Sequence, residues 1–173
     1  KKMILPRSGF QSSVNLGYDL ARADKVRDFV PTEATMQVIE ELVLATAPHA
    51  TERAHILVGA YGKGKSHAVL VLLSLLAKRH REALAPTLAA LECYRPELGQ
   101  YLRTQVLAEN AAPMLPVIVD GTQKHLASSF LLALKRTLAA AHLSALLPET
   151  PYQAAVRQIH RWQKEFPATY QAL

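Results

Sequence analysis

Residues 54–66 read Ala-His-Ile-Leu-Val-Gly-Ala-Tyr-Gly-Lys-Gly-Lys-Ser, and this stretch decides the fold expected of the chain. Residues 55–58 are rich in apolar and β-forming side chains, as a parallel strand covered on both faces should be. Residues 59–66 match the pattern G-x-x-x-x-G-K-[ST] of a phosphate-binding loop. The stretch therefore predicts a buried strand that runs directly into a loop for phosphate groups.

Each residue type that this motif requires has a physical role. Gly59, Gly62 and Gly64 let the backbone adopt positive φ angles and approach an anion closely, so that successive N–H groups can point inward. We expect Lys65 to bring a compact positive charge to the β and γ phosphates, and Ser66 to place its hydroxyl on Mg²⁺. The alternative is a glycine turn without a ligand. The loop predicts binding of a nucleoside triphosphate with Mg²⁺ by Gly59, Ala60, Tyr61, Gly62, Lys63, Gly64, Lys65 and Ser66.

The remaining elements are expected to be mostly helical. A helix should follow the loop, because residues 65–79 contain no Gly or Pro and residues 78–80 are basic. A second strand is expected at residues 114–120, an apolar run stopped by Gly121, and residues 14–16 offer a third. Further helices are expected over residues 19–27, 32–47, 82–92, 97–110, 125–146 and 152–164.

Together these elements predict an α/β fold with a P-loop NTPase core, rich in helices and with an incomplete parallel sheet. Such sheets have about five strands, and this chain offers two or three. Residues 1–58 precede the loop and no GTPase or transporter signature occurs, which favours an AAA-like ATPase. We expect residues 1–31 to form an N-terminal leader. Residues 32–173 should form the N-terminal part of a nucleotide-binding domain that continues past Leu173.

Asp120 is the candidate for a second metal-binding residue. It ends the apolar run of the second expected strand, where P-loop enzymes usually present a carboxylate to the Mg²⁺ shell. However, Gly121 stands where AAA-like ATPases place a glutamate that activates water. The alternative for Asp120 is a turn at the end of the strand, since Asp-Gly is a common turn pair.

The composition sets the broad class of the protein. Of 173 residues, 50% are hydrophobic and 20% charged, which fits a single globular unit without a signal peptide or membrane span in the sequence. Cys93 is the one cysteine, so an internal disulfide is excluded and a cytoplasmic location is expected. The formal net charge of +6 permits an acidic partner, although the basic residues form no continuous block.

Several segments resemble the N-terminal ATPase region of large bacterial phage-defence proteins, the BREX-type ATPases and their relatives. They are residues 13–19, 29–32, 59–67, 115–118 and 130–134, of which only the loop is a specific motif. The resemblance implies ATP binding by the loop, with His67 following it as a further cofactor-binding position. It also implies an Asp-Glu pair for Mg²⁺ further along a longer chain, because these 173 residues contain none.

Three functions stay open at this point. The first is an ATP-binding module of a larger AAA-like ATPase, in an anti-phage defence assembly whose action on DNA rests on resemblance only. The second is a small-molecule or nucleotide kinase, and the third a degenerate P-loop scaffold for protein contacts. In an AAA-like ATPase, residues 30–32 would hold the adenine, and the alternative is that they only cap the following helix.

Overall fold

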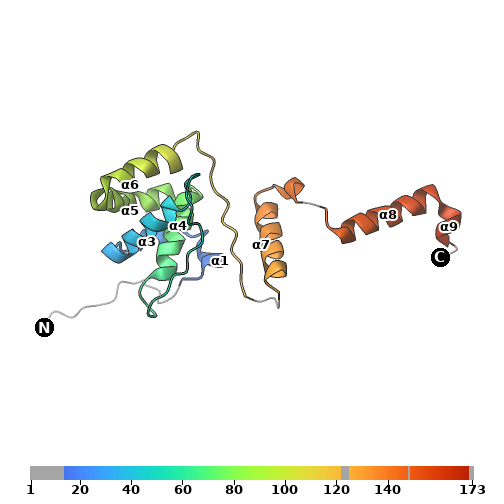
Figure 1. Ribbon diagram of the computed structural model, residues 1–173, viewed down its shortest axis with the longest axis horizontal. Helices are drawn as coiled ribbons and strands as arrows, with labels where there is room; N and C mark the ends of the chain where they lie inside the picture. Colours follow the sequence, from blue (N-terminus) through green and yellow to red (C-terminus); the bar gives the residue numbers. More distant parts are fainter. Residues whose placement is uncertain (1–13, 122–124, 148, 172–173) are drawn as a thin grey trace. The chain divides into compact units, whose positions relative to one another are not determined.

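The computed structural model describes residues 14–121, 125–147 and 149–171. The chain divides into two compact units, residues 1–118 and residues 119–173 (Figure 1). All the regular elements in the described ranges are helices.

The helix that follows the loop of residues 59–66 is the centre of the first unit. Helix α4, Lys65–Leu76, confirms the helix predicted there and contacts α1, α2, α3 and α5. Leu70, Val71 and Leu75 are fully buried, and apolar residues occur all around the helix rather than on one stripe. A helix that is apolar on every face is stable only when other elements cover it, which places α4 inside the unit.

Helix α3 packs along α4 and begins at a strong local signal. It spans Glu33–Leu44, and the side chains and backbones of Thr32 and Thr35 bond each other reciprocally in a capping box. Ile39 and Val43 are buried on its inner stripe. The predicted helix is therefore confirmed, and Thr32 takes the capping role that was one of its two expected functions.

The segment ahead of α3 is helical rather than extended. Helices α1, Leu16–Asp19, and α2, Ala23–Arg27, both contact α4. The third strand suggested at residues 14–16 is wrong, because the Asn15 side chain accepts a hydrogen bond from the N–H of Gly17 and starts α1. The division expected between residues 31 and 32 stays a prediction.

Helices α5, Arg81–Tyr94, and α6, Pro96–Tyr101, form a close pair that continues into a turn of π-helix, η1, Leu102–Val106. The two helices approach closely at Gly99, where an added Cβ would lie 2.3 Å from Cγ of Glu92. An ion pair of 2.9 Å between Arg95 and the buried Glu40 ties the pair to α3. The helix predicted at residues 82–92 is confirmed, and the one predicted at residues 97–110 is confirmed as far as Val106, after which the chain turns.

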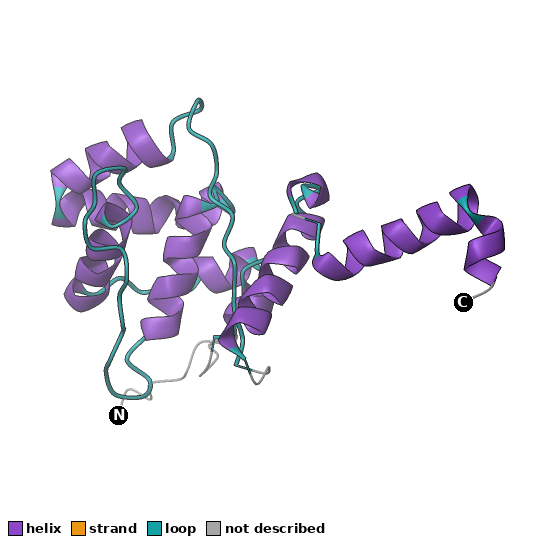
Figure 2. Cartoon of the chain, turned by 45° about the vertical axis from the view of Figure 1, so that its right-hand side comes forward, coloured by secondary structure: helices purple, strands orange, loops and turns teal. Residues whose placement is uncertain are grey.

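The predicted α/β fold class is wrong, because the described residues contain no strand and no sheet (Figure 2). Both expected strands, residues 55–58 and 114–120, have an irregular backbone, and Ile56 and Val58 are 90% and 89% exposed. A β-forming side chain favours a strand only when the backbone finds a partner for its N–H and C=O groups. In the first unit the helices pack on one another instead, around α4.

The second unit consists of α7, Leu126–Ala140, a 3₁₀ turn η2, Ser144–Leu146, α8, Pro151–Glu165, and α9, Pro167–Gln171. The long helix predicted over residues 125–146 ends earlier than expected, and His142 then adopts a left-handed φ of 58°. The helix predicted over residues 152–164 is confirmed as α8. Among the described helices, none has both the length and the apolar character needed to cross a bilayer.

Candidate functional site

The loop of residues 59–66 reverses the chain by means of two left-handed glycines. Gly62 has a φ of 76° and Gly64 a φ of 78°, and Gly64 is also the N-cap of α4. Side chains disfavour this region, so both positions call for glycine. Gly59 has no such requirement, because a Cβ added there would lie 3.6 Å from Cδ of Lys65, which is an ordinary contact distance. Two of the three predicted glycines thus have a conformational requirement.

Lys65 folds back over the loop that precedes it. Its Nζ atom donates to the carbonyl oxygens of Gly59 and Ala60, both at 2.7 Å. These two hydrogen bonds hold the ammonium group over the backbone of residues 59–60. Because an ammonium group has three N–H donors, one remains for a further hydrogen bond. The structure therefore brings together the first and last parts of the predicted motif, with the lysine charge between them.

The other predicted loop residues face solvent. Ala60, Tyr61, Lys63 and Ser66 are all exposed. Ser66 lies in the first turn of α4, where the backbone N–H groups have no partner inside the helix and the helix dipole favours an anion. Residues 59–66 thus combine a fixed lysine, two left-handed glycines, an accessible hydroxyl and a helix N-terminus.

The start of α3 lies next to this loop. A Cβ added to Gly64 would lie 3.8 Å from Cγ2 of Thr35, a normal packing distance. Residues 30–32, which were expected to hold the base or to cap the helix, lead directly into this first turn of α3. Val30 is exposed, and the Thr32 hydroxyl is engaged in the capping box. The base-binding function of these residues stays a prediction.

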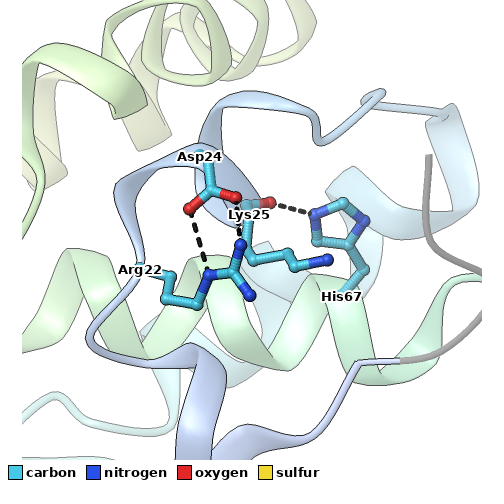
Figure 3. A network of polar contacts seen from close by, with 4 residues as sticks. All are labelled: Arg22, Asp24, Lys25 and His67. Atoms are coloured by element: carbon cyan, nitrogen blue, oxygen red, sulfur yellow. Dashed lines mark hydrogen bonds and ion pairs between the residues drawn. The ribbon is translucent and has the colours of Figure 1, made fainter. Parts of the chain in front are cut away.

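His67 turns its ring toward α2 (Figure 3). Its Nε2 atom lies 2.6 Å from the carbonyl oxygen of Lys25, and its ring meets the ring of Phe29 edge-on at 5.1 Å between centroids. Because a carbonyl oxygen can only accept, Nε2 must carry the hydrogen. The ring of His67 thus joins α4 to α2, and a direct contact of this residue with a cofactor stays a prediction.

A second histidine makes the matching contact at the other end of α4. The Nε2 atom of His80 lies 3.0 Å from the carbonyl oxygen of Leu20. His67, in the first turn of α4, and His80, the N-cap of α5, thus hold the two ends of the segment 20–25. Sequence reasoning missed both contacts, because a histidine bonded to a distant carbonyl leaves no local pattern.

Arg22 and Asp24 form a surface pair at the start of α2 (Figure 3). The guanidinium donates to both carboxylate oxygens, at 2.7 and 3.3 Å. These hydrogen bonds from Arg22 hold the pKa of the Asp24 carboxyl below its usual value. Both side chains are solvent-exposed, so the pair orders the start of α2 and adds little to stability.

The second predicted metal-binding residue, Asp120, belongs to the second unit, whereas Ser66 belongs to the first. Nowhere in the described ranges do three or more His, Cys, Asp or Glu side chains gather as a metal site would require. A role for Asp120 on Mg²⁺ therefore stays a prediction.

The chain matches no protein-family model, no curated protein and no solved structure. The case for a nucleotide site consequently rests on the residues and geometry of the loop itself. The resemblance to phage-defence ATPases stays a prediction.

Proposed function

We propose that residues 59–66 bind the phosphates of a nucleoside triphosphate together with Mg²⁺. The observation that carries this proposal is the position of Lys65, whose Nζ atom is held by the carbonyls of Gly59 and Ala60 at 2.7 Å. A lysine needed only for solubility would extend into water, because fixing its side chain costs roughly 2 kcal/mol of rotamer entropy. Here the charge is held over its own loop, beside the helix N-terminus.

The loop leaves room for an anion beside its backbone. A Cβ added to Gly62 would meet nothing within 4 Å, so there is open space on that side of the backbone. We expect an anion bound by the loop to accept a hydrogen bond from the third N–H of Lys65 and from N–H groups at the start of α4. The side chain of Lys65 would move little on binding, since its position is already set.

Mg²⁺ would be held through Ser66. Its hydroxyl is exposed in the first turn of α4 and can take one position on the ion, with phosphate oxygens and water supplying the others. The ion would supply positive charge that offsets the negative charge of the phosphates. We assign no residue of this chain to the activation of water, so the proposal concerns binding.

The resemblance to phage-defence ATPases is the ground for three finer proposals. They are that the nucleotide is ATP, that the chain belongs to a larger ATPase, and that this ATPase acts in phage defence. In that setting the loop would be the phosphate-binding part of an assembly whose other subunits or domains, and any DNA, are its partners. A kinase or a scaffold without nucleotide would use the same loop differently, and direct binding measurements separate the scaffold from the other two.

The test is isothermal titration of the chain with ATP and Mg²⁺. Lys65→Ala removes a charged hydrogen bond to the ligand, worth about 1.5 to 3 kcal/mol, so the dissociation constant should rise roughly 10- to 100-fold. Lys63→Ala removes an exposed charge from the same loop and should cost less, and Lys164→Ala, in the second unit, should leave binding unchanged.

Two further measurements make the result specific. Circular dichroism should show the same helix content in Lys65→Ala as in the parent chain, because α4 keeps its N-cap at Gly64. GTP titrated in parallel reports the base preference. Unchanged ATP affinity in Lys65→Ala, or no binding of either nucleotide to the parent chain, would contradict the proposal.

A further inference from the structure

His67 is the residue of the first turn of α4 that points inward. Ser66, one position earlier, is exposed, whereas His67 is half-buried and its ring faces α2 (Figure 3). Successive residues of a helix lie about 100° apart around its axis, so the two side chains leave the same turn in different directions. The turn that offers Ser66 and backbone N–H groups to a ligand is thus also the turn that His67 fastens to the protein.

The hydrogen bond that His67 makes reaches the end of α2. Its Nε2–H donates to the carbonyl oxygen of Lys25 at 2.6 Å. The last four carbonyls of a helix have no partner within it, and the N–H of Phe29, which would bond Lys25 in a longer helix, bonds Val26 at 3.2 Å instead. His67 therefore supplies a hydrogen bond to the end of α2 from 42 positions away in the sequence.

The other side of this contact is fixed in the core of the first unit. Residues 25–29 are here called the anchor segment. Within it Val26 is fully buried and Phe29 is 7% exposed, and the Phe29 ring meets the ring of His67 edge-on. Helix α2 also contacts α5. His67 therefore joins the start of α4 to a segment that cannot shift without disturbing close-packed side chains.

The chain that follows the anchor segment makes a second contact with the start of α4. It enters α3, where Cγ2 of Thr35 lies 3.8 Å from the position that a Cβ on Gly64, the N-cap of α4, would take. The two contacts flank Lys65 and Ser66, the residues of α4 that we assign to the ligand. Only the contact of His67 is directional, because a hydrogen bond depends on both distance and angle.

We propose that His67 is a positioning residue through which the anchor segment controls the affinity of the loop for nucleotide. This inference rests on the nucleotide site proposed above. His67 acts without touching the ligand, because it sets where the first-turn N–H groups and the Ser66 hydroxyl lie relative to Lys65. Groups already held in place bind more tightly than groups that binding must first order. Such coupling is reciprocal, so a bound nucleotide should also stabilise the anchor segment.

Isothermal titration with ATP and Mg²⁺ tests the proposal on variants of the whole chain. His67→Leu places an apolar side chain against Phe29 but has no N–H to donate. Its dissociation constant should rise roughly tenfold, toward the lower end of typical coupling between sites. His67→Gln keeps an N–H donor and should recover part of the affinity that His67→Leu loses.

His80→Leu is the matched control. His80 donates a bond of the same kind to the carbonyl oxygen of Leu20 at 3.0 Å, but it is the N-cap of α5 and follows the last residue of α4. Both leucine variants should unfold at lower urea concentration, because each loses one hydrogen bond. Only His67→Leu should lose affinity for nucleotide. An equal change of the dissociation constant in both variants overturns the proposal, since His67 would then be a structural contact alone.

Hydrogen exchange of the parent chain, with and without ATP, measures the reciprocal effect and depends on no variant. The N–H groups of Asp28 and Phe29, which bond to carbonyls of α2, should exchange more slowly when nucleotide is bound. The same exchange rates with and without bound nucleotide refute the coupling, as does unchanged affinity in His67→Leu. A parent chain that binds no nucleotide contradicts the proposed function itself, so the two failures are told apart.

Discussion

Gly99→Ala should destabilise the first unit, although alanine is the better helix former. In a helix interior the substitution gains about 1 kcal/mol of propensity. Here, however, the new Cβ would lie 2.3 Å from Cγ, 3.1 Å from Cβ and 3.2 Å from Cα of Glu92, on the facing helix α5. Rotation of Glu92 can relieve only the first contact. We expect overpacking to cost roughly 2 to 3 kcal/mol, and a net loss of about 1 kcal/mol in the free energy of unfolding.

Rotation of Glu92 is itself opposed, because its carboxylate is bonded to Arg103, with Nε of Arg103 at 2.7 Å from Oε1. This pair is largely exposed and worth at most about 1 kcal/mol. Glu92→Ala removes both the pair and the Cγ that Gly99→Ala would strike. In that background, Gly99→Ala should therefore cost less than it does alone, and the two substitutions should not be additive.

The assay is urea unfolding of the parent chain, both single variants and the double variant, followed by circular dichroism. A net loss of about 1 kcal/mol would also lower the Tm by roughly 5 °C in a unit of this size. Stabilisation by Gly99→Ala would refute the close approach of α5 and α6 at this point. Strict additivity of the two substitutions would refute the role of the Glu92 side chain.

Two further predictions concern single polar groups. The Ser74 hydroxyl in α4 is fully buried and has no hydrogen-bond partner among the described residues. Ser74→Ala should therefore raise the free energy of unfolding by about 1 kcal/mol. A lower stability of this variant in urea unfolding would show that the hydroxyl has a partner. The pKa of Asp24 lies below its usual value because Arg22 hydrogen-bonds the ionised form. The pair therefore stabilises the folded chain at pH values above the usual carboxyl pKa, and this stabilisation is lost as the pH falls through the lower pKa of the folded state. A carbon NMR titration should show the Asp24 midpoint rising in Arg22→Gln, and an unchanged midpoint would count against the pair.

Much of the helical structure could be predicted from local patterns. Thr32 and Thr150 each start a helix with a capping box, and Gly64 in the left-handed region starts α4, all within a few residues of the helix they begin. The arrangement around α4 was not predictable in the same way. His67 of α4 and His80 at the start of α5 contact the segment 20–25, and these contacts join residues that are 42 and 60 positions apart in the sequence.

The sequence by itself determined the turn in residues 59–66, because Gly62 and Gly64 set the conformation of their own backbone. Only the tertiary structure decided whether residues 55–58 and 114–120 are strands, since a strand needs a neighbouring strand for its backbone groups and the described residues contain no strand. It likewise decided that the Lys65 ammonium lies over the carbonyls of Gly59 and Ala60, the contact on which the proposed nucleotide site rests.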